Sequence, residues 1–350
     1  MIRTAIVGLG AVAGWHEAAI ERTPGAELVA VADVDGSRVE RVAARTGVAG
    51  YTDLDRLLRD APVDWVHVCT PIRTHYDLAM RCVDHGVDVL VEKPFVRTRE
   101  EFERLTAAAD RAGVRATVVH NQVYYPSVMD ACRRIERGEF GRLHGVSVRW
   151  AEDVDPRRPD RGDWVLDLPG GEFGEGIVHP IYVGLRAAGY PADSSAVSVG
   201  RIDTTGDETV AFDGIAVSYT TADGVACTIQ HHSNVPDRRR IDFAAERAHV
   251  TVDVATGSVR VQRDSYGPNA SGAYPALRAA VDGLGGAVRT TVDAVADAVW
   301  RRVADAESRH DTHSPVIRRE AAAIRGRGDG PTPRAEADWA NRLFTRLCDP

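Results

Sequence analysis

Residues 4–14 read TAIVGLGAVAG, a short apolar run that leads into a glycine-rich loop. Residues 11–23, AVAGWHEAAIERT, continue with the apolar spacing of a helix. A strand, a tight turn and a helix in this order fit the G-x-G-x-x-G/A pattern, here with Gly8, Gly10 and Ala13. Gly8 permits the turn, Gly10 lets a pyrophosphate approach the backbone, and Ala13 allows the helix to pack closely on the strand. The stretch therefore predicts a dinucleotide-binding βα unit.

The same alternation of strand and helix continues to residue 121. Apolar strands are expected at residues 27–35, 63–71, 87–94 and 115–121, with amphipathic helices between them. Strands that are apolar nearly throughout and are joined by helices form a parallel sheet buried on both faces. This part of the chain is therefore expected to be a doubly wound α/β fold, whose ligands bind beyond the carboxyl ends of the strands.

The end of the second strand indicates which dinucleotide is bound. That strand ends at Asp33, 23 residues beyond Gly10. A carboxylate there accepts hydrogen bonds from an adenosine ribose and repels a 2′-phosphate, which favours NAD over NADP. Asp35 could share this role, and the nearby Arg38 leaves NADP open.

Lys93 stands out because it is the only lysine among 350 residues, although Lys and Arg together number 43. An amine can exchange a proton near neutral pH, whereas a guanidinium cannot; the alternative is a leftover surface lysine. Pro94 favours an extended backbone at Lys93, which helps to aim the side chain out of its strand end. Residues 69–71, CTP, followed by His75, occupy the end of the preceding long strand. Both strand ends are expected on the nicotinamide side of the crevice.

Taken together, the glycine loop with His16, the Thr-Pro element with His75 and the Glu-Lys-Pro element resemble the Gfo/Idh/MocA family, named for glucose–fructose oxidoreductase and inositol 2-dehydrogenase. The resemblance implies a Rossmann domain, expected over residues 1–122. It also implies a C-terminal α/β domain over residues 123–350, with an open, mostly antiparallel sheet that carries the substrate pocket and often the oligomer contacts. The expected cofactor-binding residues are Gly8, Gly10, Ala11, Val12, Ala13, Asp33, Thr70, Pro71, His75, Glu92 and Lys93.

Residues 168–182, LPGGEFGEGIVHPIY, resemble the family's glycine-led segment, which ends in a helix with an acid and a histidine four residues apart. Glu175 and His179 hold these positions, so one helix face would present both. The sequence departs from the family pattern at Glu175, where aspartate is common. It departs again at Tyr182, where many sugar and polyol dehydrogenases carry another aspartate, and at Ile72, which replaces an asparagine. The pocket is therefore expected to differ from those of the inositol and glucose enzymes.

The expected reaction is hydride transfer between NAD and a secondary hydroxyl or ketone of a sugar, polyol, inositol or sugar-acid derivative. His179 is expected to act as the base, with Lys93 hydrogen-bonded to the same oxygen and Glu175 orienting either group. The expected catalytic residues are Lys93, His179 and Glu175. One alternative is an NAD-dependent glycosidase or lyase that oxidises its substrate transiently, and another is a cofactor-sensing protein without turnover.

The remaining expectations for the second domain concern its pocket. Residues 120–128, HNQVYYPSV, resemble the family's hinge into this domain. In the loop that leads to the glycine segment, a lid over the substrate could be formed by Arg157, Arg158, Arg161 or Trp164; the alternative is a solvated loop. Residues 211–234 and 239–264 alternate in polarity and predict an antiparallel meander. The expected substrate-binding residues are Asn121, Tyr124, Trp164, His179 and Tyr182.

Composition limits the function classes. The net charge of −8, with acids and arginines interspersed, argues against a nucleic acid or an anionic membrane as partner. Five cysteines without C-x-x-C spacing, and no leader-like N-terminus, predict a cytoplasmic protein, and an open sheet favours a homodimer or homotetramer. His231 and His232 should point to opposite faces of a strand, and His310 and His313 lack a further identifiable ligand, so no metal is expected.

Overall fold

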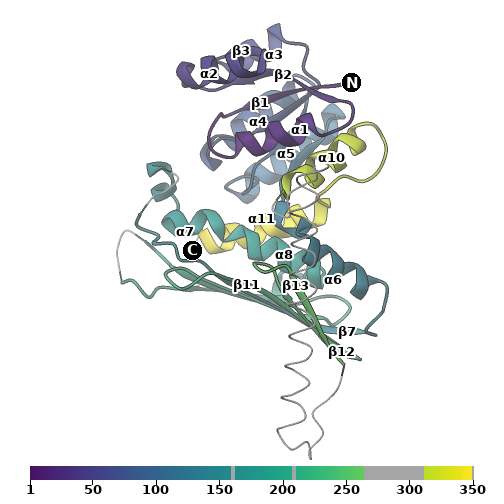
Figure 1. Cartoon of the computed structure of the whole chain (residues 1–350). Helices are drawn as coiled ribbons and strands as arrows, with labels where there is room; N and C mark the ends of the chain where they lie inside the picture. Colours follow the sequence, from purple (N-terminus) through teal and green to yellow (C-terminus); the bar gives the residue numbers. More distant parts are fainter. Residues whose placement is uncertain (159–161, 207–209, 264–310, 349–350) are drawn as a thin grey trace, which may run out of the picture. The chain divides into compact units, whose positions relative to one another are not determined.

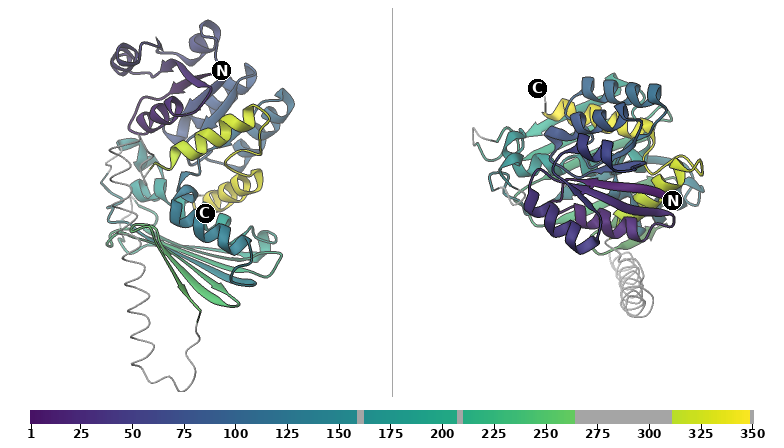
Figure 2. Two further views of the ribbon diagram at one scale, coloured as in Figure 1. Left: turned by 45° about the vertical axis from the view of Figure 1, so that its right-hand side comes forward. Right: turned by 90° about the horizontal axis from the view of Figure 1, so that it is seen from above.

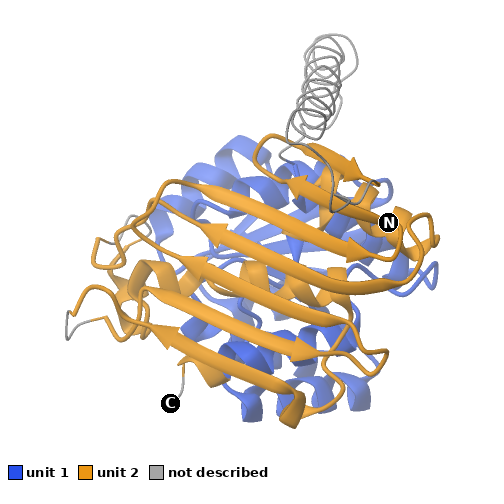
Figure 3. Ribbon diagram, turned by 90° about the horizontal axis from the view of Figure 1, so that it is seen from below, with its two compact units in different colours: residues 1–121, 311–345 blue, residues 122–310, 346–350 orange. Residues whose placement is uncertain are grey.

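The computed structural model describes residues 1–158, 162–206, 210–263 and 311–348 (Figure 1). The chain forms two compact units, which are coloured separately in Figure 3. The first contains residues 1–121 and 311–345, and the second contains residues 122–310 and 346–350. The first division between the units lies close to the expected boundary at residue 122, and residues 311–345, which were expected in the second domain, are part of the first unit. Arg161 and His310 lie outside the described residues.

The first unit is built on a six-stranded sheet in the order β3-β2-β1-β4-β5-β6. All of its strand pairs are parallel, and order reverses between β1 and β4, as expected for a doubly wound dinucleotide-binding fold. Every residue of β4 is buried, and all of them except His67 are apolar, as is typical of a strand covered on both faces. The strands are β1 Ile2–Val7, β2 Ala26–Ala32, β3 Ala49–Tyr51, β4 Trp65–Val68, β5 Asp88–Val91 and β6 Ala116–Val118.

Local signals define where the helices of this unit begin and end. Thr98 and Glu101 form a reciprocal capping box at the start of α5, and Gly113 ends that helix in the left-handed conformation. The helices are α1 Ala13–Glu21, α2 Gly36–Thr46, α3 Leu54–Asp60, η1 Ile72–Thr74, α4 His75–Asp84 and α5 Arg99–Ala112, followed by η2 Asn121–Tyr124 at the boundary of the units.

A C-terminal segment completes the first unit. Its helices are α10 His313–Ile324 and α11 Arg334–Cys348, and α10 packs against α1 (Figure 1). The carboxylate of Glu320 is fully buried and accepts hydrogen bonds from Arg115 and Thr117 at the edge strand β6. Glu336 lies 2.7 Å from the Nδ1 atom of His120. These partners are about 200 residues apart, so local sequence patterns carried no sign of the pairing.

The second unit contains a seven-stranded sheet in the order β13-β12-β11-β7-β10-β9-β8. All of its pairs are antiparallel except that of β7 with β10, so the expected mostly antiparallel sheet is confirmed. His231 is buried and His232 half-buried, as expected for neighbours on one strand. The strands are β7 Leu143–Ala151, β8 Val197–Ile202, β9 Gly214–Thr220, β10 Ala226–His232, β11 Arg238–Ala245, β12 Ala248–Asp253 and β13 Ser258–Gln262.

The described helices of the second unit lie on one side of this sheet (Figure 2). Helix α8 packs on β7 and β10, and α6 packs on β12 and β13. Figure 3 shows the opposite face, which no described helix crosses. These helices are α6 Pro126–Glu136, η3 Asp163–Asp167, α7 Gly171–Gly176, α8 Val178–Ala188 and η4 Ser194–Ala196. Among the described helices of the whole chain, none combines the length and apolar character needed to span a bilayer.

Candidate active site

The turn after β1 depends on glycine at position 8. Gly8 has a φ of +90°, and a Cβ added there would lie 2.6 Å from the carbonyl oxygen of Cys69 and 2.7 Å from Thr70 Cγ2. The ends of β1 and β4 thus approach each other too closely for any side chain. This contact joins the glycine loop, residues 8–14, to the Thr-Pro element.

The glycine loop has the properties of a phosphate cradle. A Cβ at Gly10 would meet no protein atom within 4 Å, so the backbone there faces open space. Helix α1 begins at Ala13 with no side-chain cap and no acidic residue in its first turn. Uncapped N–H groups and the positive end of the helix dipole favour an anion at this position. These features fit the pyrophosphate of a dinucleotide.

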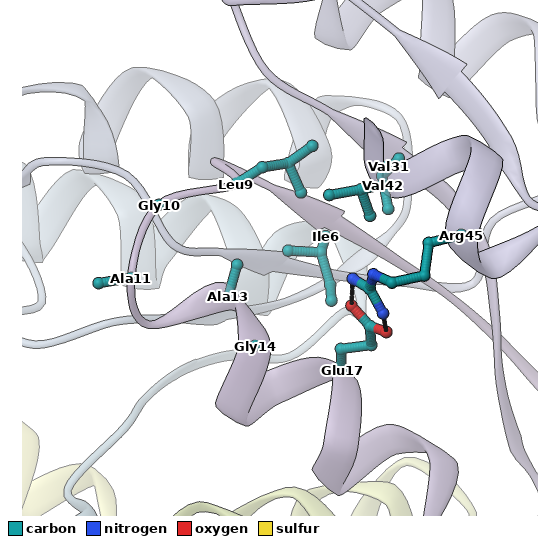
Figure 4. Close-up of a pocket in the computed structure, with 10 residues that line it drawn as sticks. All are labelled: Ile6, Leu9, Gly10, Ala11, Ala13, Gly14, Glu17, Val31, Val42 and Arg45. Atoms are coloured by element: carbon teal, nitrogen blue, oxygen red, sulfur yellow. Dashed lines mark hydrogen bonds and ion pairs between the residues drawn. The ribbon is translucent and has the colours of Figure 1, made fainter. Parts of the chain in front are cut away.

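A cavity of about 220 Å³ borders the glycine loop (Figure 4). One end carries the ion pair of Glu17 with Arg45, in which a guanidinium nitrogen lies 2.7 Å from Glu17 Oε2. The cavity is smaller than the roughly 300–1,000 Å³ that is usual for ligand pockets, so it does not by itself accommodate a dinucleotide. Its lining residues are Ile6, Leu9, Gly10, Ala11, Ala13, Gly14, Glu17, Val31, Val42 and Arg45.

Asp33 lies directly beside the glycine loop. Its Oδ2 accepts a hydrogen bond from the backbone N–H of Leu9 at 2.6 Å, and its Oδ1 accepts one from the N–H of Asp35 at 2.9 Å. Each carboxylate oxygen keeps a further lone pair for a ribose hydroxyl. Asp35 instead caps α2 through Ser37, and Arg38 lies 3.8 Å from Asp33. The geometry thus favours Asp33 over Asp35 as the ribose ligand.

Lys93 directly follows Glu92 at the carboxyl end of β5 and is half-buried. The backbone N–H of Lys93 donates to Glu92 Oε2 at 3.1 Å, and the Lys93–Pro94 peptide bond is cis. The other oxygen, Oε1, lies 2.9 Å from His16 Nε2 and 3.3 Å from His313 Nε2. Both oxygens of Glu92 thus have partners within the protein, which supports the loop that carries Lys93; the expected contact of Glu92 with the cofactor stays a prediction.

The buried surroundings of Glu92 determine its charge. Burial alone would raise the pKa of Glu92, but hydrogen bonds and charge interactions with His16 and His313 outweigh it and hold the pKa well below its usual range. Burial lowers the pKa of His16 and lowers that of His67 still further. His67 Nδ1 lies 2.9 Å from His16 Nδ1. Sequence analysis missed both His67 and His313 as neighbours of this carboxylate.

His75, which was expected to contact the cofactor, has both ring nitrogens close to backbone carbonyl oxygens. Its side chain is buried, with Nδ1 2.9 Å from the carbonyl oxygen of Pro94 and Nε2 2.7 Å from that of Thr70. Burial lowers the pKa of His75, although the two carbonyl contacts act in the opposite direction. The imidazole therefore ties the loop after β4 to the loop after β5. Pro71 directly precedes η1, and Thr70 is half-buried at the strand end.

In the second unit, Glu175 and His179 lie on two consecutive helices rather than on the single helix that was expected. Helix α7 ends at Gly176 and α8 begins at Val178. Pro180 has no N–H to donate to the carbonyl of Gly176, which interrupts the helical hydrogen bonds at this point. Ile177 between the helices keeps a helical conformation, with φ of −60° and ψ of −24°. Glu175 and His179 are both buried.

Tyr182 is the direct partner of His179. Its hydroxyl oxygen lies 2.6 Å from His179 Nδ1 and accepts a hydrogen bond from the backbone N–H of Gln122 at 3.2 Å. The side chain is fully buried, at 0% exposure. The hydroxyl of Tyr182 thus contacts His179 directly, and the expected contact of Tyr182 with substrate stays a prediction.

The other expected substrate contacts differ in their exposure. Asn121, in the first unit, donates its amide hydrogen bond to Thr312 at 3.0 Å. Tyr124, in the second unit, is buried, and the guanidinium of Arg186 lies 6.0 Å from the centre of its ring. Trp164 in η3 is half-buried. Of the three, Tyr124 is the least accessible to a ligand.

Comparisons with known proteins support the assignment of the first unit as a dinucleotide-binding fold. Residues 2–120 match the model of the GFO_IDH_MocA family, described as an oxidoreductase family with an NAD-binding Rossmann fold. The chain is 33% identical to scyllo-inositol 2-dehydrogenase (NAD(+)) of Bacillus subtilis (strain 168) over 143 residues, which are 40% of this chain and 42% of that protein. The chain thus spans less than half the length of this relative.

Two further matches extend along more of the chain. Inositol 2-dehydrogenase of Rhizobium meliloti (strain 1021) is 26% identical over 267 residues, covering 73% of this chain and 79% of that protein. The structure of the WlbA dehydrogenase from Bordetella pertussis, a complex with NADH and UDP-GlcNAcA, aligns over 99% of this chain and 94% of that one. It shares the fold, with a TM-score of 0.76 at 21% identity. Residues 2–120, which lie in the first unit, thus form an NAD-binding Rossmann domain of the Gfo/Idh/MocA family of oxidoreductases.

Proposed function

We propose that this protein is an NAD-dependent dehydrogenase that transfers hydride between the nicotinamide and a secondary hydroxyl or ketone of a carbohydrate-like substrate. The substrate class comprises sugars, polyols, inositols and sugar-acid derivatives. Relatives named as inositol, D-apiose and UDP-N-acetylglucosamine dehydrogenases support this class. The alternatives of a glycosidase or lyase with transient oxidation, and of a sensor without turnover, gain no support from these names.

The observation that carries the proposal is the position of the chain's only lysine. Lys93 follows β5 in a unit that matches an NAD-binding oxidoreductase family. It lies at the carboxyl ends of the parallel strands, where such units bind their ligands. NAD bound there supplies the acceptor for hydride. The Lys93 ammonium would donate a hydrogen bond to the substrate oxygen and stabilise negative charge as its proton leaves.

His179 is proposed as the group that exchanges the hydroxyl proton. Its Nδ1 lies 2.6 Å from the Tyr182 hydroxyl, so in this proposal Nε2 is the nitrogen that would exchange the proton. An imidazole with one nitrogen held in place can pass a proton through the other, provided that nitrogen comes within about 3 Å of the substrate oxygen. That Lys93 and His179 share one substrate oxygen stays a prediction, as does the role of Glu175 in orienting either group.

The test is a screen of free sugars, polyols, inositols and their ketones with NAD and NADP, followed by the absorbance of the reduced cofactor. We expect turnover with at least one member of this class and a preference for NAD. Lys93→Arg keeps the positive charge but cannot exchange the proton, so it should retain NAD binding in calorimetry and lose turnover. Full activity of this variant, or no turnover of any alcohol or ketone by the wild type, would contradict the proposal.

The cytoplasmic location and the homodimer or homotetramer expected from the sequence stay predictions. Size-exclusion chromatography with light scattering would determine the oligomeric state. A monomer at micromolar concentration would contradict the expectation.

A further inference from the structure

A compact group of potential metal ligands lies within the first unit, outside the residues proposed to contact substrate. It consists of His16 on α1, Glu92 after β5 and His313 at the start of α10. Glu92 Oε1 lies 2.9 Å from His16 Nε2 and 3.3 Å from His313 Nε2, and the three ligand atoms all lie within 4.8 Å of one another. We call these three residues the His-Glu-His cluster.

The cluster has the donors and the spacing of a transition-metal site. Two imidazole nitrogens and one carboxylate oxygen form a ligand set used by zinc enzymes and by non-haem iron enzymes. Ligands at about 2.0–2.2 Å from a tetrahedral zinc ion are roughly 3.3 Å from one another, close to both distances from Glu92. All three residues are buried, with exposures of 0%, 5% and 9% for His16, Glu92 and His313. A small closure of the ligands around an ion would complete the geometry.

A second layer of contacts orients the ligands. His67 Nδ1 lies 2.9 Å from His16 Nδ1, so His16 can donate through Nδ1 while its Nε2 faces the carboxylate. Metal-bound histidines usually have such a partner on the other ring nitrogen, which fixes the tautomer. On the other side, Trp15 stacks on the His313 ring at 6.1 Å, and the Lys93 N–H holds the second oxygen of Glu92. Each of the three ligands therefore has a contact outside the cluster that restricts its orientation.

We propose that the His-Glu-His cluster binds one divalent transition-metal ion of the zinc class. The ion would fasten the C-terminal segment, residues 311–345, to the sheet of the first unit, because His313 is the cluster's only member from that segment. Three protein ligands leave a fourth position for water. This site does not depend on the proposed dehydrogenase activity. It also reverses the expectation of no metal, which considered His313 only together with His310.

The experiment uses the full chain, stripped with a chelator and then titrated with Zn²⁺ or Co²⁺. We expect one tightly bound equivalent by elemental analysis, a higher unfolding temperature with metal, and weak visible Co²⁺ bands typical of nitrogen and oxygen ligands. His313→Gln keeps an N–H that can bond Glu92 but removes the imidazole ligand, so it should fold and lose the equivalent. His67→Phe should weaken binding roughly 10- to 100-fold, as the loss of an outer partner does. His85→Ala, at an exposed histidine of the same unit, is the control.

Each result decides between a metal site and a hydrogen-bonded cluster. Loss of the equivalent in His313→Gln but not in His85→Ala supports the site. The proposal is overturned if the wild type takes up no stoichiometric metal, or if His313→Gln binds it as tightly. A strong near-ultraviolet charge-transfer band of bound Co²⁺ would also overturn it, because such a band would place the ion on cysteine thiolates.

Discussion

Replacing Tyr182 by phenylalanine tests whether this residue holds the imidazole or contacts the substrate. The substitution removes one oxygen and keeps the ring in its fully buried site. Two partners then lose their hydrogen bond, namely His179 Nδ1 at 2.6 Å and the backbone N–H of Gln122 at 3.2 Å. The structure therefore predicts an effect on both stability and proton transfer.

The magnitudes follow from those two contacts. A buried donor or acceptor left unsatisfied costs about 1–3 kcal/mol, so the free energy of unfolding should fall by about that amount. A hydrogen bond of this kind contributes about 0.5–1.5 kcal/mol net, which corresponds to a fall in kcat of roughly 2- to 13-fold if it orients the reacting imidazole. KM should remain near the wild-type value, because the tyrosine is not accessible to substrate.

The assay compares kcat, KM and urea unfolding of Tyr182→Phe with those of Tyr219→Phe. Tyr219 is also buried in the second unit, and its hydroxyl donates to the carbonyl oxygen of Gly189 at 3.0 Å. The control should lose stability without losing kcat. The reasoning is refuted if Tyr182→Phe raises KM while kcat is unchanged, since that pattern belongs to a substrate contact, or if both variants lower kcat equally.

Three further predictions concern the cofactor, pH and the C-terminal segment. Asp33→Ser should weaken NAD binding roughly 10- to 150-fold in calorimetry, because hydrogen bonds to a charged group contribute about 1.5–3 kcal/mol. It should also reduce the preference of the protein for NAD over NADP, and an unchanged preference would contradict the role of Asp33. Burial lowers the pKa of His231 to about 3, so it stays neutral in the fold while the unfolded residue gains a proton below about pH 6.5. When the pH falls from about 7.5 to about 5.5, the free energy of unfolding of the wild type, measured with urea, should fall by about 1.4 kcal/mol more than that of His231→Asn. Equal losses in the two proteins would refute this prediction. Glu336→Ala leaves buried His120 without this hydrogen bond and should cost about 1–3 kcal/mol, seen as a lower thermal midpoint; an unchanged midpoint would contradict the pairing.

The architecture of the first unit could be predicted because its determinants are local. Gly8 and Gly10 are separated by one residue, most of the strands are largely apolar, and the ligand-binding edge follows from the strand order. The return of residues 311–345 could not be predicted, because it depends on single buried pairs such as Glu320 with Arg115, which are 205 residues apart. Such pairs leave no periodic pattern in the sequence.

For the candidate site, the sequence identified residues more reliably than their roles. Motif position indicates that a side chain lies near a strand end, but it does not indicate which atoms the side chain engages. His75 and Glu92 were expected to touch the cofactor. In the structure the ring nitrogens of His75 lie within 2.9 Å of two backbone carbonyl oxygens, one of which a neutral imidazole can bond, and both oxygens of Glu92 have partners within the protein. Side-chain types do not indicate which backbone carbonyl or N–H group a side chain will bond, because nearly every residue carries both groups.

The same distinction changes how position 182 bears on substrate. As a pocket residue, tyrosine in place of aspartate would remove a carboxylate anchor and predict a substrate with different hydroxyls. In the structure the side chain is fully buried and bonded to His179 Nδ1, so the replacement changes the partner of the imidazole instead. A carboxylate partner would stabilise a protonated imidazole, whereas a neutral phenol stabilises it less. If His179 is the base as proposed, the tyrosine would change how readily the imidazole holds a proton, and the half-buried Trp164 stays the more accessible of the expected substrate contacts.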